Sequence, residues 1–100
     1  METVHENGAM NSRTMERSAE LMFSNDYRAR LAAEWGQVKI RLRKLRKLLY
    51  DHQNGKINFD PTCTSPITLL KEQELVMQEY VDILEKRIEL EGINISEYFK

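Results

Sequence analysis

The chain has 100 residues, with 15 Lys or Arg against 16 Asp or Glu and a formal net charge of −1. A chain of this length forms one domain and buries only about 60% of the surface that its unfolded form exposes, so we expect a thin core. The near-zero charge argues against binding of duplex DNA, which usually takes a strongly basic domain. Because Cys63 is the one cysteine, an internal disulfide and a cysteine-rich zinc site are excluded.

The sequence has no apolar run of about 18 residues, and its first residues lack the pattern of a signal peptide. We therefore expect a cytoplasmic protein that does not contact a membrane. Residues 1–11 are polar and follow no period, which predicts a disordered leader. Residues 12–100 are expected to form a single helical domain.

A short helix is predicted over residues 12–24, where the apolar side chains follow an amphipathic pattern, and a long helix over residues 26–53. Asn25 or Asp26 can cap the long helix. Its apolar residues recur at spacings of four and three and form one seam: Leu31, Trp35, Val38, Leu42, Leu45 and Leu49. Gly36 lies inside this seam, which indicates the close approach of another chain or a ligand; a merely tolerated glycine is the alternative.

Residues 54–65 are predicted to form a loop, followed by a second long helix over residues 66–91. Ser65 suits the N-cap of that helix and Pro66 its first position. The loop is too short to span a 25-residue helix with ease, so we expect the two long helices to pair as an antiparallel hairpin. The tail, residues 92–100, is expected to dock as a terminal turn or arm.

The second long helix carries two apolar stripes. The first stripe consists of Leu70, Met77, Val81, Leu84 and Ile88, and the second stripe of Leu69, Val76, Tyr80, Ile83 and Leu90. The stripes are rotated by one residue, or roughly 100° around the helix, so one partner helix cannot cover both. We expect the second stripe to pack against the short helix or another subunit. The predicted fold is therefore all-α: a short N-terminal helix plus an antiparallel two-helix hairpin, assembled into a helical-bundle oligomer.

Signatures of catalysis are missing from the sequence, which has no Gly-rich phosphate loop and no pair of His ligands at helical spacing. His5 and His52 lie in the leader and near a helix end, where solvated side chains are the ordinary case. We predict a binding protein with no catalytic residues, no metal and no cofactor.

The two long helices carry opposite charge. Residues 26–50 hold eight Lys or Arg and two Asp or Glu, a balance of +6, whereas residues 66–91 hold three and seven, a balance of −4. Two interpretations remain open. The charges can flank the seam as they do in coiled coils. Alternatively, part of the surplus, especially Lys39, Arg43, Arg46 and Arg87, faces an anionic partner, since Arg and Lys bind phosphate and carboxylate well.

The second long helix reads Leu69-Leu70-x-x-Gln73-x-x-x-Met77-x-x-Tyr80-x-Asp82-Ile83-Leu84-x-x-Arg87-Ile88. The first long helix carries a matching set of Glu34, Val38, Arg41, Leu42, Lys44 and Leu45. Together they resemble the phage helical-hairpin proteins that sponge immune signals, a family that includes inhibitors of the CBASS and Thoeris defence systems. The resemblance spans roughly residues 26–91. It implies a homo-oligomer that holds cyclic nucleotides or cyclic ADP-ribose-type molecules between subunits without cleaving them.

The resemblance makes Tyr80 and Arg87 candidate ligand-binding residues. The charge pattern adds Lys39 and Arg43, and Trp35 is either a core anchor or a platform on which a base stacks. The first functional hypothesis is a phage-encoded antagonist of bacterial immunity that sequesters a nucleotide second messenger in the cytoplasm of the infected cell. The alternative is a small helical phage protein, including the anti-CRISPR type, that inhibits a host protein by direct binding. A structural bundle element without a ligand is the third hypothesis.

Overall fold

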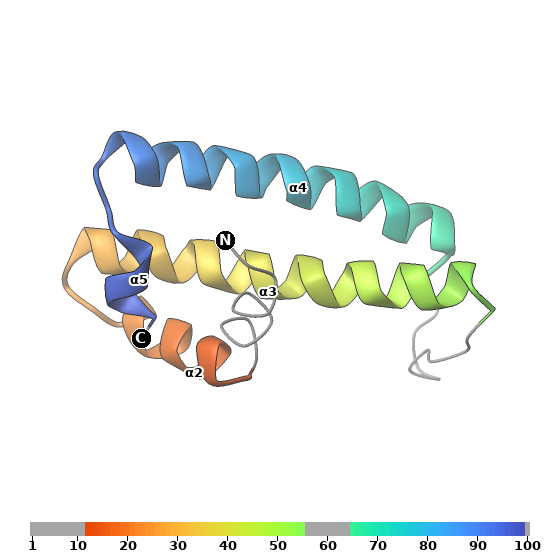
Figure 1. Ribbon diagram of the computed structural model, residues 1–100, viewed down its shortest axis with the longest axis horizontal. Coiled ribbons are helices and arrows are strands. Elements are labelled where there is room, and N and C mark those ends of the chain that lie inside the picture. The colour runs from red at the N-terminus through yellow and green to blue at the C-terminus, as the bar shows by residue number, and fades with distance from the viewer. Residues whose placement is uncertain (1–11, 56–64, 100) are drawn as a thin grey trace.

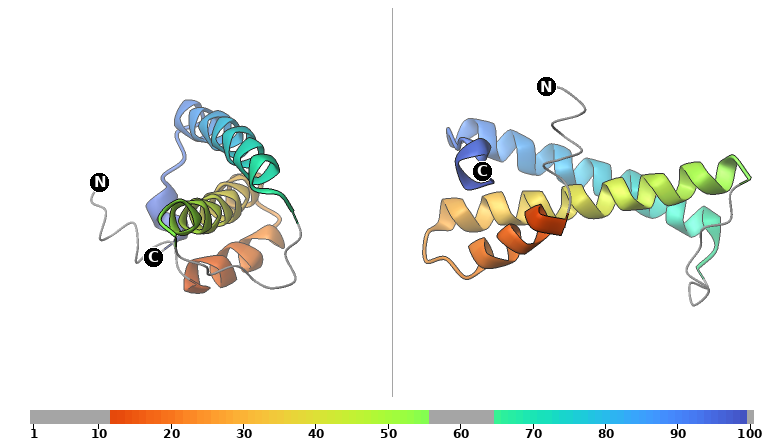
Figure 2. Two further views of the ribbon diagram at one scale, coloured as in Figure 1. Left: turned by 90° about the vertical axis from the view of Figure 1, so that its right-hand side faces the viewer. Right: turned by 60° about the horizontal axis from the view of Figure 1, so that its bottom comes forward.

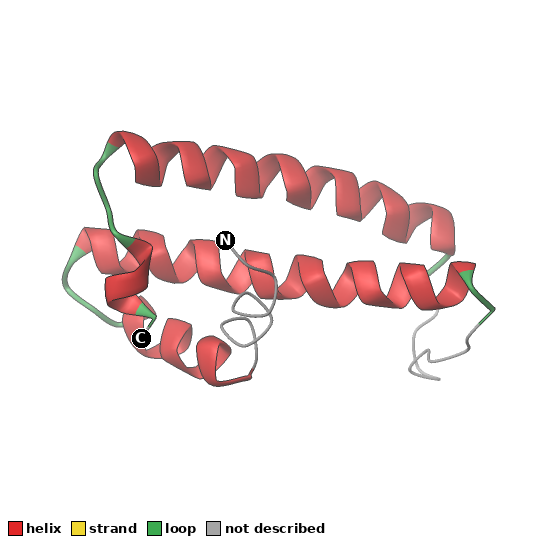
Figure 3. Ribbon diagram, viewed as in Figure 1, coloured by secondary structure: helices red, strands yellow, loops and turns green. Residues whose placement is uncertain are grey.

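The computed structural model of the protein describes residues 12–55 and 65–99. Its regular elements in these ranges are helices: α2 (Ser12–Met22), α3 (Tyr27–Gln53), α4 (Ile67–Leu90) and α5 (Ile95–Tyr98). Within the described ranges there is no strand (Figure 3), so the prediction of an all-α fold is confirmed. The predicted leader, residues 1–11, and residues 56–64 of the predicted loop lie outside the described residues.

The central element is α3, which packs against α4 on one side and α2 on the other. Figure 1 shows α4 beside α3 along most of its length, with the two helices running in opposite directions. The end-on view in Figure 2 places α3 between α4 and α2, and α5 lies against the N-terminal part of α3. Because α2 packs on α3, it leaves the outer side of α4 uncovered.

Local chemistry accounts for most of the helix ends. The Oδ1 atom of Asp26 accepts a hydrogen bond from the backbone N–H of Arg28 at 3.0 Å, which confirms the cap predicted for α3. Past the ends of α3 and α4, Gly55 and Gly92 adopt φ values of 79° and 68°, which glycine tolerates without strain.

The predicted start of α4 was wrong by one residue. Pro66 is the N-cap itself, with an extended backbone, and its carbonyl oxygen accepts the first helical hydrogen bond, from the backbone N–H of Leu70 at 3.1 Å. Ser65 therefore lies one residue too early to cap the helix. Likewise α2 ends at Met22, two residues before the predicted end.

Two clusters of the core meet at the C-terminal segment. One cluster joins Leu31 of α3 to Leu84 and Ile88 of α4, and Ile93, which follows the end of α4, completes it. The other joins Leu21 of α2 to two alanines of α3, Ala29 and Ala33. Tyr98 contacts both clusters, and Phe99 contacts the second. The seam predicted along α3 is thus only one of its two packing faces, because small residues form the face toward α2.

The C-terminal segment explains Gly36. The ring of Phe99 lies so close to α3 that a Cβ atom at position 36 would be 2.7 Å from Cζ of that ring. Phe99 also contacts the Trp35 ring, with 6.0 Å between the ring centroids. The close approach that the sequence indicated is therefore made by the protein's own C-terminal segment.

We predict that Gly36→Ala and Phe99→Ala are coupled. In a Phe99→Ala background, Gly36→Ala should raise the free energy of unfolding by roughly 0.5–1 kcal/mol, because alanine favours the helix. In the native background this gain should vanish or reverse, since the new methyl group displaces the Phe99 ring. Urea unfolding of the four variants measures the coupling, and equal effects in both backgrounds would contradict the contact.

Candidate functional site

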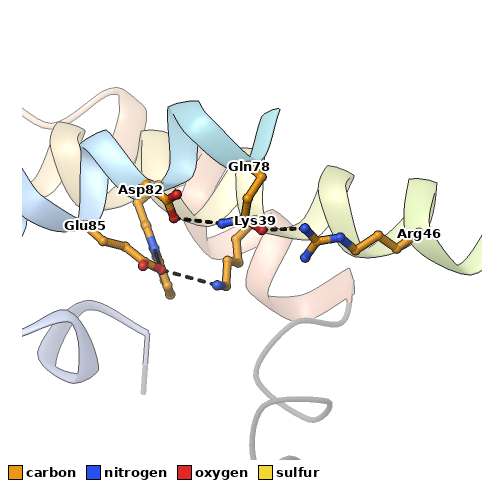
Figure 4. A network of polar contacts seen from close by, with 6 residues as sticks. Lys39, Arg46, Gln78, Asp82 and Glu85 are labelled. Carbon is orange, nitrogen blue, oxygen red and sulfur yellow. Dashed lines mark hydrogen bonds and ion pairs between the residues drawn. The ribbon is translucent and has the colours of Figure 1, made fainter. Parts of the chain in front are cut away.

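The five residues predicted to bind ligand are divided among different sides of the α3–α4 pair. Trp35 and Lys39 lie together because both bind Glu85: the indole Nε1–H donates at 3.0 Å and the ammonium Nζ at 3.2 Å to the same Oε2 atom. Figure 4 shows the Lys39–Glu85 contact bridging the two helices. In this structure Trp35 and Lys39 therefore direct their polar groups at α4.

The same side of the helix pair continues with further polar contacts. The guanidinium of Arg46 donates to Glu74 at 3.0 Å. It also donates to Gln78, whose amide donates to Asp82 at 2.8 Å (Figure 4). Arg43 lies between Lys39 and Arg46 in the sequence. Its side chain is half-buried and also has an interaction partner. For Lys39 and Arg46, the structure thus matches the interpretation in which the opposite charges of the two helices flank the seam.

Arg87 lies on the other side of α4, since it follows Glu85 by two positions and this turns the helix by roughly 200°. Its guanidinium donates to the hydroxyl oxygen of Tyr27, and its Cζ atom lies 6.0 Å from the centre of the Tyr27 ring. The Tyr27 hydroxyl in turn donates to a carboxylate oxygen of Glu91 at 3.0 Å. This chain of contacts fixes an arginine and a tyrosine side by side at the surface.

A surface hollow of about 340 Å³ opens beside this pair, between the start of α3 and the end of α4. It is lined by Met22, Tyr27, Arg30, Leu31, Glu34 and Arg87. Arg30 is held by a hydrogen bond from its Nη1 atom to the backbone oxygen of Ser24 at 2.9 Å. The volume lies at the lower end of the roughly 300–1,000 Å³ found for small-molecule sites.

The lining of this hollow combines three kinds of group. Arg30 and Arg87 offer N–H donors to an anion, the Tyr27 ring offers an aromatic face, and the Glu34 carboxylate offers an acceptor for hydroxyl or N–H groups. A phosphate, a heterocyclic base and a ribose need these three partners. Of this set, the sequence singled out only Arg87 for binding. The sequence did not indicate Tyr27 and Arg30. About 60 residues separate them from Arg87 along the chain, and only the fold brings them together.

A second hollow, of about 520 Å³, lies between the end of α3 and the start of α4. Arg46, Tyr50 and Lys71 line it, together with Leu49, Gln53, Glu74 and Leu75. It combines basic and aromatic groups as well, but Arg46 is already engaged by Glu74 and Gln78. Tyr80 belongs to neither hollow and lies on the second stripe with 39% of its surface exposed.

Among the described residues there is no group of three or more His, Cys, Asp or Glu side chains that could hold a metal ion. The helices within these ranges are also not long and apolar enough to cross a membrane.

The described residues form a small helical protein with a mixed polar and aromatic hollow at its surface. The family model Sequestin matches residues 25–90, so the chain belongs to the Sequestin family. The predicted membership of a sequestering family, over nearly the same range, is confirmed. The family's name denotes the sequestration of a molecule, which is binding and not catalysis. Searches of curated proteins and of solved structures find no match.

We predict that Lys39 and Glu85 act as one pair. Lys39→Gln and Glu85→Gln should each lower the free energy of unfolding by about 0.5–1 kcal/mol, because the pair is partly exposed to solvent. The double variant should lose no more than the larger single loss, and both losses should shrink at about 1 M salt. Glu89→Gln, an exposed change on the same helix, serves as the control. Additive losses in the double variant would show that the two side chains act independently.

Proposed function

We propose that this protein is a phage-encoded anti-defence protein that sequesters a nucleotide immune signal without cleaving it. The signal is a cyclic oligonucleotide or a cyclic ADP-ribose-type molecule, and the site of action is the cytoplasm of the infected bacterium. Family membership supports sequestration, and the resemblance of residues 26–91 to phage signal sponges supports the kind of signal.

The observation that carries the proposal is the hollow beside Tyr27 and Arg87. Its two guanidinium groups suit a phosphate, its aromatic ring suits a base, and Glu34 suits a ribose hydroxyl. The contacts to Ser24 and Tyr27 hold the two arginines in place before a ligand arrives. This reduces the conformational entropy lost on binding.

The hollow is too small to enclose a whole cyclic dinucleotide. We therefore propose that part of the ligand lies against a further subunit, in a homo-oligomer. The binding roles predicted for Trp35, Lys39, Arg43 and Tyr80 stay predictions. For Trp35 and Lys39, ligand binding would have to compete with their shared contact to Glu85.

We predict that one signal molecule stabilises the protein strongly. At 100 times its dissociation constant, a ligand adds roughly 2.7 kcal/mol to the free energy of unfolding, which raises the melting temperature by roughly 10 °C in a domain of this size. Thermal unfolding against cyclic dinucleotides, cyclic trinucleotides and cyclic ADP-ribose isomers measures the shift. Mass spectrometry of the ligand released by heat should find it intact. A cleaved product would refute sequestration. If no ligand shifts the melting temperature, the proposal that the protein binds a nucleotide signal is refuted.

We also predict which side chains carry the affinity. Arg30→Gln and Arg87→Gln should each weaken binding by roughly 10- to 100-fold, the range expected when one hydrogen bond to a charged group is lost. Lys44→Gln is the matched control, because Lys44 is an exposed cation of α3 about 21 Å along the helix from Arg30. Calorimetric titration measures the three affinities. An equal loss in all three variants would indicate nonspecific charge attraction and not a site in the hollow.

Direct inhibition of a host protein is the rival function, and the exposed second stripe of α4 is the observation that favours it. Affinity purification from bacterial lysate separates the two. A stoichiometric protein partner would favour the rival, whereas a nucleotide carried through purification without any protein would favour sequestration.

A further inference from the structure

The outer side of α4 is apolar and uncovered. The second stripe places Leu69, Val76, Ile83 and Leu90 at intervals of seven residues, and these side chains are 52%, 59%, 58% and 81% exposed. The first stripe of the same helix is buried or half-buried against α3. A line of four exposed aliphatic side chains covers about 31 Å of helix, and surfaces of this kind usually serve as interfaces.

The stripe has the spacing of a coiled-coil seam. Gln73, Tyr80 and Arg87 lie four residues after the first three aliphatic residues, so the whole face alternates steps of four and three from residue 69 to residue 90. Such a repeat lets two helices keep the same faces in contact over their full length. The face is therefore suited to another long helix, and less to a compact globular surface.

We propose that the second stripe of α4 is a two-fold interface with the same stripe of a second copy, and that the two α4 helices run antiparallel. A two-fold axis between residues 79 and 80 places Leu69 opposite Leu90 of the partner subunit. It also places Val76 opposite Ile83 of the partner subunit. Every aliphatic residue of the line then meets an aliphatic residue, which is the self-complementarity that a two-fold interface requires.

The charged residues near the stripe favour a second copy of this chain as the partner and an antiparallel orientation of the two helices. The acidic residues beside the stripe, Glu72 and Glu79, lie in its first half, and the basic residues, Lys86 and Arg87, lie in its second half. In the antiparallel pair, Glu72 lies beside Lys86 and Arg87 of the partner subunit, twice by symmetry. Only Glu79 lies near its own copy, at the axis. In a parallel pair, Glu72 would lie beside the opposite flank of the second helix, where it meets no basic residue, and Arg87 would lie next to its own copy and repel it.

The proposal of this interface rests on the homo-oligomer of the proposed function, but it does not depend on nucleotide binding. It also gives the hollow a neighbour, because Arg87 belongs both to the hollow and to the stripe. In the antiparallel pair, the start of α4 of the partner subunit lies next to this hollow. The second copy would therefore supply part of the wall that the hollow lacks.

Sedimentation equilibrium of the full chain tests the interface. The native protein should sediment as a dimer or as an assembly of dimers, and Ile83→Glu should weaken the α4 contact at least roughly 100-fold, because it places two carboxylates in the apolar line. Leu75→Glu is the matched control: Leu75 is 67% exposed on the same helix but lies about 100° away from the stripe. Circular dichroism of each variant checks that the helices remain folded. A monomeric native protein, or a folded Ile83→Glu variant that associates as strongly as the control, would overturn the proposal.

A charge exchange tests the orientation. Glu72→Lys should weaken association, since it faces Lys86 and Arg87 of the partner subunit, and adding Lys86→Glu should restore at least part of the loss. In a parallel pair, Glu72 would have no charged partner in the second copy, so Glu72→Lys would leave association nearly unchanged and the second change would restore nothing. Either result would overturn the antiparallel register.

Calorimetric titration of the Ile83→Glu monomer with the cyclic nucleotide that stabilises the native protein separates the two proposals. If the native protein is a dimer that Ile83→Glu disrupts, and neither form binds a nucleotide, the interface is supported and the proposed function is refuted. A native monomer that binds the nucleotide refutes the interface alone.

Discussion

The contact of Leu31 with Leu84 and Ile88 fixes the positions of the other parts of the molecule. It sets the two long helices against each other at the end where α2, α5 and the candidate hollow also lie. With this contact made, Tyr27 reaches Arg87 and Glu91 across the helix pair, and Ile93 closes the cluster at the end of α4. The candidate site therefore lies beside this cluster, with which it shares Leu31, on helices whose packing holds its side chains in place, as a preorganised binding site requires.

Polar contacts between α3 and α4 set the register along the rest of their length. Glu85 accepts hydrogen bonds from Trp35 and Lys39, and Glu74 accepts one from Arg46. Two carboxylates of α4 thus bind two cations of α3 at points about three helical turns apart. These pairs are partly exposed, so each adds little stability. Their main effect is on register, because a shifted pairing would leave the cations of α3 without carboxylate partners.

A chain of this size has too little core to bury all its apolar side chains. In this protein one group of exposed apolar side chains forms the second stripe of α4, and the hollow with its two arginines lies at the border of that stripe. Arg87 belongs to both surfaces. The proposed interface and the proposed ligand site are therefore neighbours on a single helix.

The sequence by itself determined the helices, because caps and apolar periodicity act locally: Asp26 caps α3 as expected. It also determined that α4 has one stripe too many for a single partner. Tertiary structure decided which groups meet. The sequence offered Trp35 and Lys39 to a ligand, but the fold brings both to Glu85. It missed Tyr27 and Arg30, because their proximity to Arg87 depends on how two helices pack, and no local pattern encodes that distance.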